Sequence, residues 1–182
     1  MQQDKLQKLE LTWIGKGDEP VLEPRILIEN PEYSFGDPNS GNMLIHGDNL
    51  LALKALEQDY AGKIKCIYID PPYNTGHAFE HYDDGVEHSV WLSLMSSRLK
   101  LLHKLLSSDG VIFVNLDEIE HAYCKIICDD IFGRSNFLGD LIWQKRKGGG
   151  NDSHFFALDH DYILVYAKNS DKKIHNQKWK VS

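Results

Sequence analysis

The residues with the clearest chemical potential are Asp70, Pro71, Pro72 and Tyr73, in the stretch IDPPYNTG. Proline fixes its own φ and has no N–H group, so the two prolines make a stiff corner whose carbonyl groups can only accept hydrogen bonds. An ionised carboxylate is also only an acceptor. This corner therefore fits a flat ring that carries an amino group, with the Tyr73 side chain stacking on the ring.

The reaction that such a corner could promote is attack by the exocyclic amine of a nucleobase such as adenine. The lone pair of this nitrogen is delocalised into the ring, so the free amine is a poor nucleophile. Two acceptors that hold its N–H bonds would draw the nitrogen towards tetrahedral geometry and stabilise the positive charge that develops during attack. The base can reach the corner only after it leaves the duplex stack. The alternative is that residues 70–73 form only a turn at the end of a strand.

The motif resembles the catalytic motif of amino-group DNA methyltransferases that use S-adenosylmethionine. The resemblance implies that Asp70 and the Pro71 carbonyl hold the target amine, that Pro72 sets the corner, and that Tyr73 stacks on the flipped base. An Asp in the first position favours adenine N6, and cytosine N4 remains the alternative.

A wider resemblance, from about Leu11 to Lys168, is to the modification subunits of type III restriction–modification systems. It implies a DNA adenine-N6 methyltransferase that takes its methyl group from S-adenosylmethionine and acts on double-stranded DNA. It also implies a restriction subunit as partner and a homodimer of full-length modification subunits. The segments that carry it are NMLIHGDNLLALKAL, KIKCIYIDPPYNTG, WLSLMSSRLKLL, GVIFVNLDEIE, IFGRSNFLGDLIWQKR and HDYILVYAK.

Hydrophobic periodicity and turn residues indicate the elements that position the corner. Asp48 is expected to cap the first helix, and Asp117 with Glu120, at capping-box spacing, to open the third. Asp70 then lies at the carboxyl end of a strand, where ligands bind in open parallel sheets. We expect strands at residues 43–46, 64–69, 111–114, 137–144 and 162–167, and helices from 48 to about 60, from 87 to 106, and from 117 to about 132.

The order of these elements predicts an α/β fold with a parallel sheet covered on both faces. The strand at residues 64–69, apolar on both faces, is expected in the interior of the sheet. The resemblance makes this the catalytic half of a Rossmann-like S-adenosylmethionine-dependent methyltransferase fold, with a final antiparallel strand pair. We expect an irregular arm at residues 1–41 with one short strand at 25–28, this catalytic half at 42–168, and a tail at 169–182 that begins a missing region.

The cofactor loop of the family, a Phe-x-Gly-x-Gly turn, has no counterpart in this sequence. The glycine cluster at residues 148–150 follows a basic stretch rather than a buried strand. We therefore expect this chain alone to bind S-adenosylmethionine poorly and to methylate nothing. The alternative is a non-catalytic truncated remnant with a binding or interaction role.

Further candidate residues lie outside the motif, each with a second interpretation. The resemblance places Asp48 near the cofactor, but Asp48 could serve only as a helix cap. Lys145, Arg146 and Lys147 could contact the DNA backbone, or could lie in a solvated loop.

The aromatic residues Tyr162 and Tyr166 fall in a segment that, by resemblance, helps to stack the extruded base. Core packing is the alternative for both. His77, His81 and Asp83 lack a fourth ligand or a Cys pair, so no metal site is expected.

The composition is that of an ordinary globular protein, with 42% hydrophobic residues and a net charge of −7. Residues 1–140 carry 12 Lys and Arg against 23 Asp and Glu, whereas residues 141–182 carry 8 against 4. This asymmetry allows a local contact with phosphates but excludes a generally basic nucleic-acid binder. The sequence has no long apolar run that could span a membrane. Its three cysteines form no disulfide framework, which suits a cytoplasmic protein.

Overall fold

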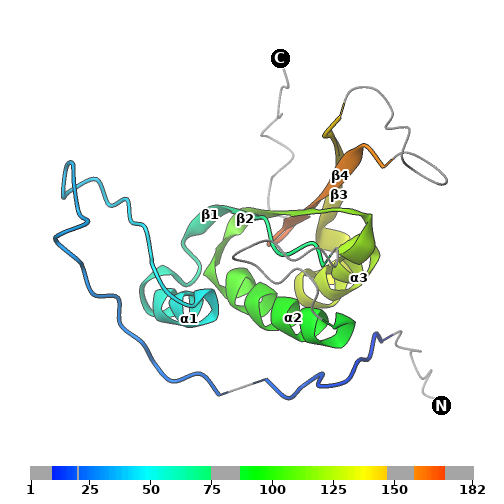
Figure 1. Cartoon of the computed structure of the whole chain (residues 1–182), viewed down its shortest axis with the longest axis horizontal. Coiled ribbons are helices and arrows are strands. Elements are labelled where there is room, and N and C mark those ends of the chain that lie inside the picture. The colour runs from blue at the N-terminus through cyan, green and yellow to red at the C-terminus, as the bar shows by residue number, and fades with distance from the viewer. Residues whose placement is uncertain (1–9, 20, 75–86, 147–157, 171–182) are drawn as a thin grey trace, which may run out of the picture.

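A four-stranded mixed sheet forms the centre of the structure (Figure 1). The computed structural model describes residues 10–19, 21–74, 87–146 and 158–170, and the strand order within them is β1-β2-β4-β3. The parallel pair is β1 (Ile64–Ile69) and β2 (Leu106–Leu116). The strands β3 (Phe137–Gln144) and β4 (His160–Ala167) are antiparallel to each other, and β4 is antiparallel to β2. The predicted final antiparallel pair is confirmed.

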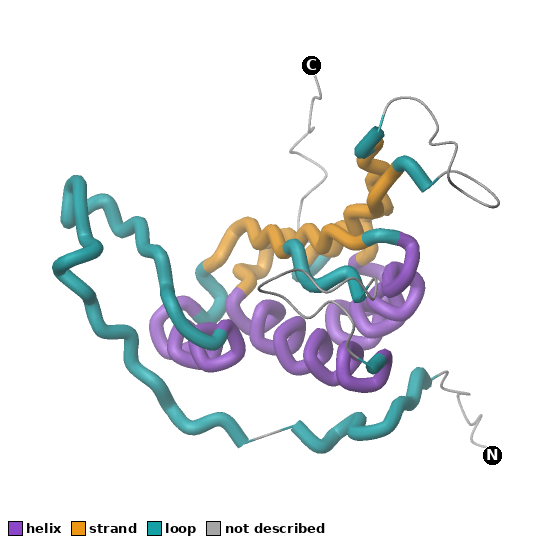
Figure 2. The backbone as a smooth tube through the Cα atoms, viewed as in Figure 1, coloured by secondary structure: helices purple, strands orange, loops and turns teal. Residues whose placement is uncertain are grey.

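Three helices lie together on one side of this sheet (Figures 1 and 2). They are α1 (Asn49–Tyr60), α2 (His88–Leu105) and α3 (Glu118–Cys128), and α2 packs against both of the others. The prediction of helices on both faces is therefore wrong for the described residues. Crossovers that advance along a sheet in one direction place their helices on the same face. Within the described ranges, no helix is both long and apolar enough to cross a membrane.

The hydrophobic core lies between the helices and one face of the sheet. Alternate residues of β2 point to this face, as the period of a strand requires. Each fully buried apolar side chain of this kind stabilises the fold by about 1.5–3 kcal/mol. The most completely buried members are Trp91, Leu92, Met95 and Leu99 of α2, Leu106, Ile112, Val114 and Leu116 of β2, Cys124 and Cys128 of α3, and Leu164 and Tyr166 of β4.

The two strands expected before α1 do not form. Residues 41–46 have no regular structure and Leu44 is 98% exposed, and residues 25–28 are likewise irregular. A strand needs a partner for its backbone N–H and C=O groups, and none pairs with these segments in the described part of the chain. The strand β1 lies at the edge of the sheet rather than in its interior, and Tyr68 is 60% exposed.

The helix ends follow the local signals in the sequence. Asp48 Oδ1 accepts a hydrogen bond from Leu51 N, and Asp117 Oδ1 accepts one from Ile119 N, so both predicted caps are confirmed. The α-helix after Asp117 ends earlier than expected, at Cys128. A π-helical turn, η1 (Asp129–Gly133), and a 3-10 turn, η2 (Arg134–Asn136), lead on to β3.

Gly110 allows the backbones of β1 and β2 to approach closely near their amino ends. A Cβ atom at this position would lie 2.7 Å from the backbone oxygen of Ile64 and 3.0 Å from that of Ser107. Gly110 lies within β2. Because Gly110 has no side chain, the backbones of β1 and β2 can pack closely at this position.

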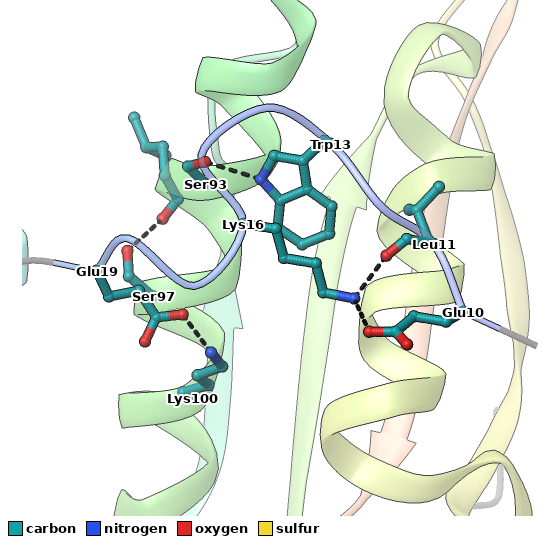
Figure 3. Close-up of polar contacts among 9 residues, drawn as sticks. Glu10, Leu11, Trp13, Lys16, Glu19, Ser93, Ser97 and Lys100 are labelled. Atoms are coloured by element: carbon teal, nitrogen blue, oxygen red, sulfur yellow. Dashed lines mark hydrogen bonds and ion pairs between the residues drawn. The ribbon is translucent and has the colours of Figure 1, made fainter. Parts of the chain in front are cut away.

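Residues 10–19 of the amino-terminal arm, which have no helix or strand, pack on α2 (Figure 3). The Trp13 indole Nε1 donates a 2.8 Å hydrogen bond to Ser93 Oγ, and Glu19 pairs with Lys100 one to two turns further along the helix. Lys16 Nζ ties this segment to itself by contacting Leu11 O and Glu10 Oε1. These contacts hold residues 10–19 against α2.

Candidate active site

The Asp-Pro-Pro-Tyr corner lies at the carboxyl end of β1, as the sequence predicted. Asp70 directly follows Ile69, the last residue of the strand, and its side chain is exposed. The Pro72 carbonyl accepts a 2.7 Å hydrogen bond from the buried Trp91 Nε1 of α2. Among the described residues, no donor binds the Pro71 carbonyl. The corner is therefore held at Pro72 and leaves the acceptors of Asp70 and Pro71 at the end of the sheet.

Asn115 orients the corner from the neighbouring strand. It is only 8% exposed, and its Nδ2 donates a hydrogen bond to Asp70 Oδ1 at 3.3 Å and another to the hydroxyl oxygen of Tyr73. Sequence reasoning missed this residue. The usable signal was a polar residue at the carboxyl end of the parallel strand beside β1, where Ile69 pairs with Val114.

The Tyr73 hydroxyl lies beside the Asp70 carboxylate, and both contact Asn115 Nδ2. Burial raises the pKa of Tyr73, and the neighbouring Asp70 carboxylate raises that pKa further. The phenol is therefore neutral.

Of the three predicted DNA-contacting residues, Lys145 and Arg146 lie in the described part and Lys147 lies outside it. Lys145 Nζ pairs with Asp161 Oδ1 at 2.7 Å, and Asp161 is buried. Its charge is thus balanced within the chain. Arg146 is exposed and follows β3.

A second carboxylate, Asp117, lies at the carboxyl end of β2 and is almost completely buried. Burial raises the pKa of Asp117, although the hydrogen bond from Ile119 N counteracts this effect. The charge of Asp161 also raises this pKa, whereas Lys145 lowers it. The carboxyl end of the sheet is therefore acidic, with Lys145 as a countercharge.

The two tyrosines of β4 have different surroundings. Tyr166 is 0% exposed, packs against Phe132 and Phe137, and donates a 2.7 Å hydrogen bond to Asp129 Oδ1. The prediction that it could stack on a base is therefore wrong, and core packing describes it.

Tyr162 remains partly accessible, but its ring stacks on His121, with centroids 4.1 Å apart. It pairs with Leu116, whereas Asn115 pairs with Ile163, so Tyr162 and Asn115 point to opposite faces of the sheet. The structure does not bring Tyr162 to the face of Asn115.

The described residues offer little that could enclose a cofactor at the corner. Within the described residues, the Asp48 side chain makes one hydrogen bond, as the cap of α1. A cavity of about 580 Å³ lies elsewhere, lined by residues 19, 21 and 22 and by parts of α1, α2 and η1, and none of residues 70–73 lines it. In the described ranges, no three His, Cys, Asp or Glu side chains are placed to hold a metal. His77, His81 and Asp83 lie outside these ranges.

Comparison with known proteins gives matches to DNA-modifying enzymes. The family model N6_N4_Mtase, described as DNA methylase, matches residues 64–182. The chain is 43% identical over 152 residues to the probable type III restriction-modification enzyme HindVI Mod subunit of Haemophilus influenzae, covering 81% of this chain and 20% of that protein. It is 34% identical over 208 residues to the EcoP15I Mod subunit of Escherichia coli, covering 94% and 32%. The chain thus spans between a fifth and a third of the length of these relatives.

Among solved structures, the PvuII DNA methyltransferase, which is cytosine-N4-specific, matches with a TM-score of 0.50 and 17% identity. The match covers 65% of this chain and 47% of that one. At this identity the likeness concerns the fold alone. The sheet and its helices form part of the Rossmann-like α/β fold of DNA methyltransferases, as the sequence predicted.

Proposed function

Because the chain belongs to the DNA methylase family N6_N4_Mtase, we propose that it carries the catalytic corner of a type III DNA adenine-N6 methyltransferase. The observation that carries the proposal is the exposed carboxylate of Asp70 at the carboxyl end of β1, beside a Pro71 carbonyl without a donor among the described residues. S-adenosylmethionine, the methyl donor that the family implies, supplies an electrophilic methyl group when bound.

The corner acts by accepting the two N–H bonds of a flipped adenine. The Asp70 carboxylate takes one bond and the Pro71 carbonyl takes the other. Both acceptors favour the positive charge that develops on the nitrogen as it forms its new bond to carbon, and this is electrostatic stabilisation where charge appears. Asn115 Nδ2 fixes the direction of the carboxylate, and Trp91 Nε1 fixes the corner at Pro72.

Tyr73 has two roles in this scheme. Its hydroxyl accepts a hydrogen bond from Asn115 Nδ2, which helps to hold the ring beside Asp70. The ring then stacks on the flipped base, which contributes about 1–3 kcal/mol.

The partners follow from the same proposal. Arg146 contacts DNA phosphates near the flipped base. Lys145 does the same, in addition to its ion pair with Asp161. The complete modification subunit works in the cytoplasm as a homodimer with a restriction subunit. No observation favours the alternative of a non-catalytic remnant. Asp48 and Tyr162 remain candidates for cofactor and base contacts, respectively.

The proposal is tested with a hybrid subunit, in which this chain replaces the matching segment of the Haemophilus influenzae Mod subunit. Mass spectrometry of nucleosides from treated DNA should show N6-methyladenine, and a hybrid with Asp70→Ala gives the background. N4-methylcytosine as the product, or a folded and DNA-binding hybrid that methylates nothing, would contradict the proposal.

The 182-residue chain is expected to bind S-adenosylmethionine poorly without the rest of a subunit. The reason is the missing Phe-x-Gly-x-Gly turn. Isothermal titration calorimetry of the chain with S-adenosylmethionine should give no heat of micromolar binding. Micromolar binding by the chain would show that its own residues build the cofactor site.

A further inference from the structure

Glu120 is the most deeply buried acid among the described residues, at 1% exposed. Its Oε1 atom accepts a hydrogen bond from Asn74 Nδ2 at 2.7 Å and lies 2.9 Å from His88 Nδ1. Its Oε2 atom is buried and has no partner in the described part of the chain. A buried carboxylate oxygen without a hydrogen-bond partner lowers the stability of the fold. Stability therefore does not explain why an acid stands at position 120.

The spacing of Glu120 after Asp117 predicts a capping box, in which the acid would return to the start of its own helix. Asp117 makes its half of this arrangement with Ile119 N. The Glu120 side chain instead reaches away from α3 to the residue that follows the catalytic corner. Glu120 therefore has the spacing of a local capping residue but makes a long-range contact with Asn74.

Asn74 has an unusual backbone conformation. Its φ of 61° is the only positive value at a non-glycine residue in the described ranges, and it directly follows Tyr73. Asn tolerates this left-handed region better than most residues, but it still prefers the right-handed helical and extended backbone conformations. Outliers of this kind persist where surrounding contacts hold them, and they cluster at functional sites. The hydrogen bond to Glu120 is such a contact.

The same carboxylate oxygen joins the corner to α2. His88 is the first residue of α2, and its ring also lies edge-on to Tyr123 of α3, with centroids 4.4 Å apart. Trp91, one turn further along α2, donates to the Pro72 carbonyl. The corner is therefore held on both sides of Tyr73, at Pro72 by Trp91 and at Asn74 by Glu120.

We propose that Glu120 is a positioning residue of the corner: it fixes the left-handed turn at Asn74, and this turn places the Tyr73 ring relative to Asp70. The structural part of the proposal stands on these contacts. Its catalytic consequence rests on the proposed function.

The structural part is tested in the 182-residue chain by NMR, using the NOE between the Tyr73 ring and the Asn115 side-chain amide. Glu120→Ala should abolish this NOE, whereas Glu120→Gln, which keeps an acceptor oxygen for Asn74, should preserve it. Glycine adopts a left-handed turn without help from a side chain. Asn74→Gly combined with Glu120→Ala should therefore restore the NOE.

If Glu120→Ala does not fold, Asn74→Ala tests the proposal in its place. Asn74 is only half-buried, so the loss of its side chain leaves the core intact. It removes both the hydrogen bond and the tolerance of positive φ, so the NOE should again be lost. Asn74→Gly alone should retain it. A folded Asn74→Ala or Glu120→Ala chain with an unchanged NOE would overturn the proposal, as would a double variant that shows no recovery.

The catalytic consequence is tested in the hybrid subunit. Glu120→Ala and Asn74→Ala should lower kcat about tenfold or more, because misplacing a reacting group slows the chemical step. The KM for S-adenosylmethionine should not change, which separates positioning from loss of the cofactor site. Glu120→Gln should keep the wild-type kcat, and a loss as large as that of Glu120→Ala would overturn the proposal.

The two proposals fail in distinguishable ways. If Asp70→Ala leaves methylation intact while the NOE responds as described, the proposed function is wrong and the positioning contact stands. If Asp70→Ala abolishes methylation but neither the NOE nor kcat changes in the Glu120→Ala and Asn74→Ala variants, the positioning proposal is wrong and the proposed function stands.

Discussion

The two ends of the parallel pair β1–β2 both carry polar side chains, but these are arranged differently. At the amino ends, Lys65 and Asp109 form an ion pair whose side chains are 68% and 48% exposed. At the carboxyl ends, the almost buried Asn115 donates to both Asp70 and Tyr73. Exposed ion pairs contribute little to stability, whereas partly buried networks fix geometry. The amino ends therefore carry a solvated ion pair, whereas at the carboxyl ends Asn115 orients the Asp70 carboxylate.

The largest effect expected of a residue outside the Asp-Pro-Pro-Tyr corner is at the carboxyl end, for Asn115→Leu. Losing the donor to Asp70 should lower methylation by the hybrid subunit up to about a hundredfold, because the carboxylate is no longer held in direction. Methyl transfer to DNA measures this. Ser107→Ala, at the amino end of the same strand, is the matched control and should retain the wild-type rate. Equal losses in both variants would remove the distinction between the two ends.

The next effect is on stability and arises at the amino end, for Gly110→Ala. The new Cβ atom would meet the backbone oxygen of Ile64, so we expect the free energy of unfolding to fall by about 1–3 kcal/mol. Urea denaturation of the chain measures this. The control Ser107→Ala again should leave stability nearly unchanged. A fully stable Gly110→Ala chain would show that the two backbones can separate freely.

A smaller effect is expected for Tyr73→Phe. Removing the hydroxyl takes away the acceptor of Asn115 Nδ2 that helps to hold the ring, so the KM for DNA should rise about threefold. Steady-state methylation at varied DNA concentration measures this. An unchanged KM would mean that this hydrogen bond does not position the ring.

The smallest effect is expected for Lys65→Met, which breaks the exposed ion pair with Asp109. Neither the melting temperature of the chain nor the methylation rate of the hybrid subunit should change measurably, since water solvates both groups. A clear loss of activity would extend the functional region to the amino end of the sheet.

The sequence predicted best those features that depend on neighbouring residues. The bounds of β1 and β3 and the caps at Asp48 and Asp117 follow from turn residues and apolar runs, and all are observed. The corner at Asp70 was placed correctly at a strand end for the same reason. The strands expected at 25–28 and 43–46 failed because a strand also needs a partner, which no local pattern supplies.

The features that sequence reasoning missed depend on pairing between distant segments. Tyr162 and Tyr166 share one face of β4, and register with β2 decides whether this face meets the site. Asn115 meets Asp70 through the register of β1 and β2. Glu120 had a plausible local role as a capping residue, and only the packing of α3 against α2 shows its contact with Asn74.

The most direct test of the central claim compares two aspartates at opposite ends of the same strand pair, Asp70→Ala and Asp109→Ala, in the hybrid subunit. With folding confirmed by circular dichroism, the rate of methyl transfer to adenine should fall about a hundredfold or more for Asp70→Ala, because its acceptor stabilises charge in the transition state. Asp109→Ala should keep the wild-type rate. Methylation by Asp70→Ala at a rate near that of Asp109→Ala would contradict the account.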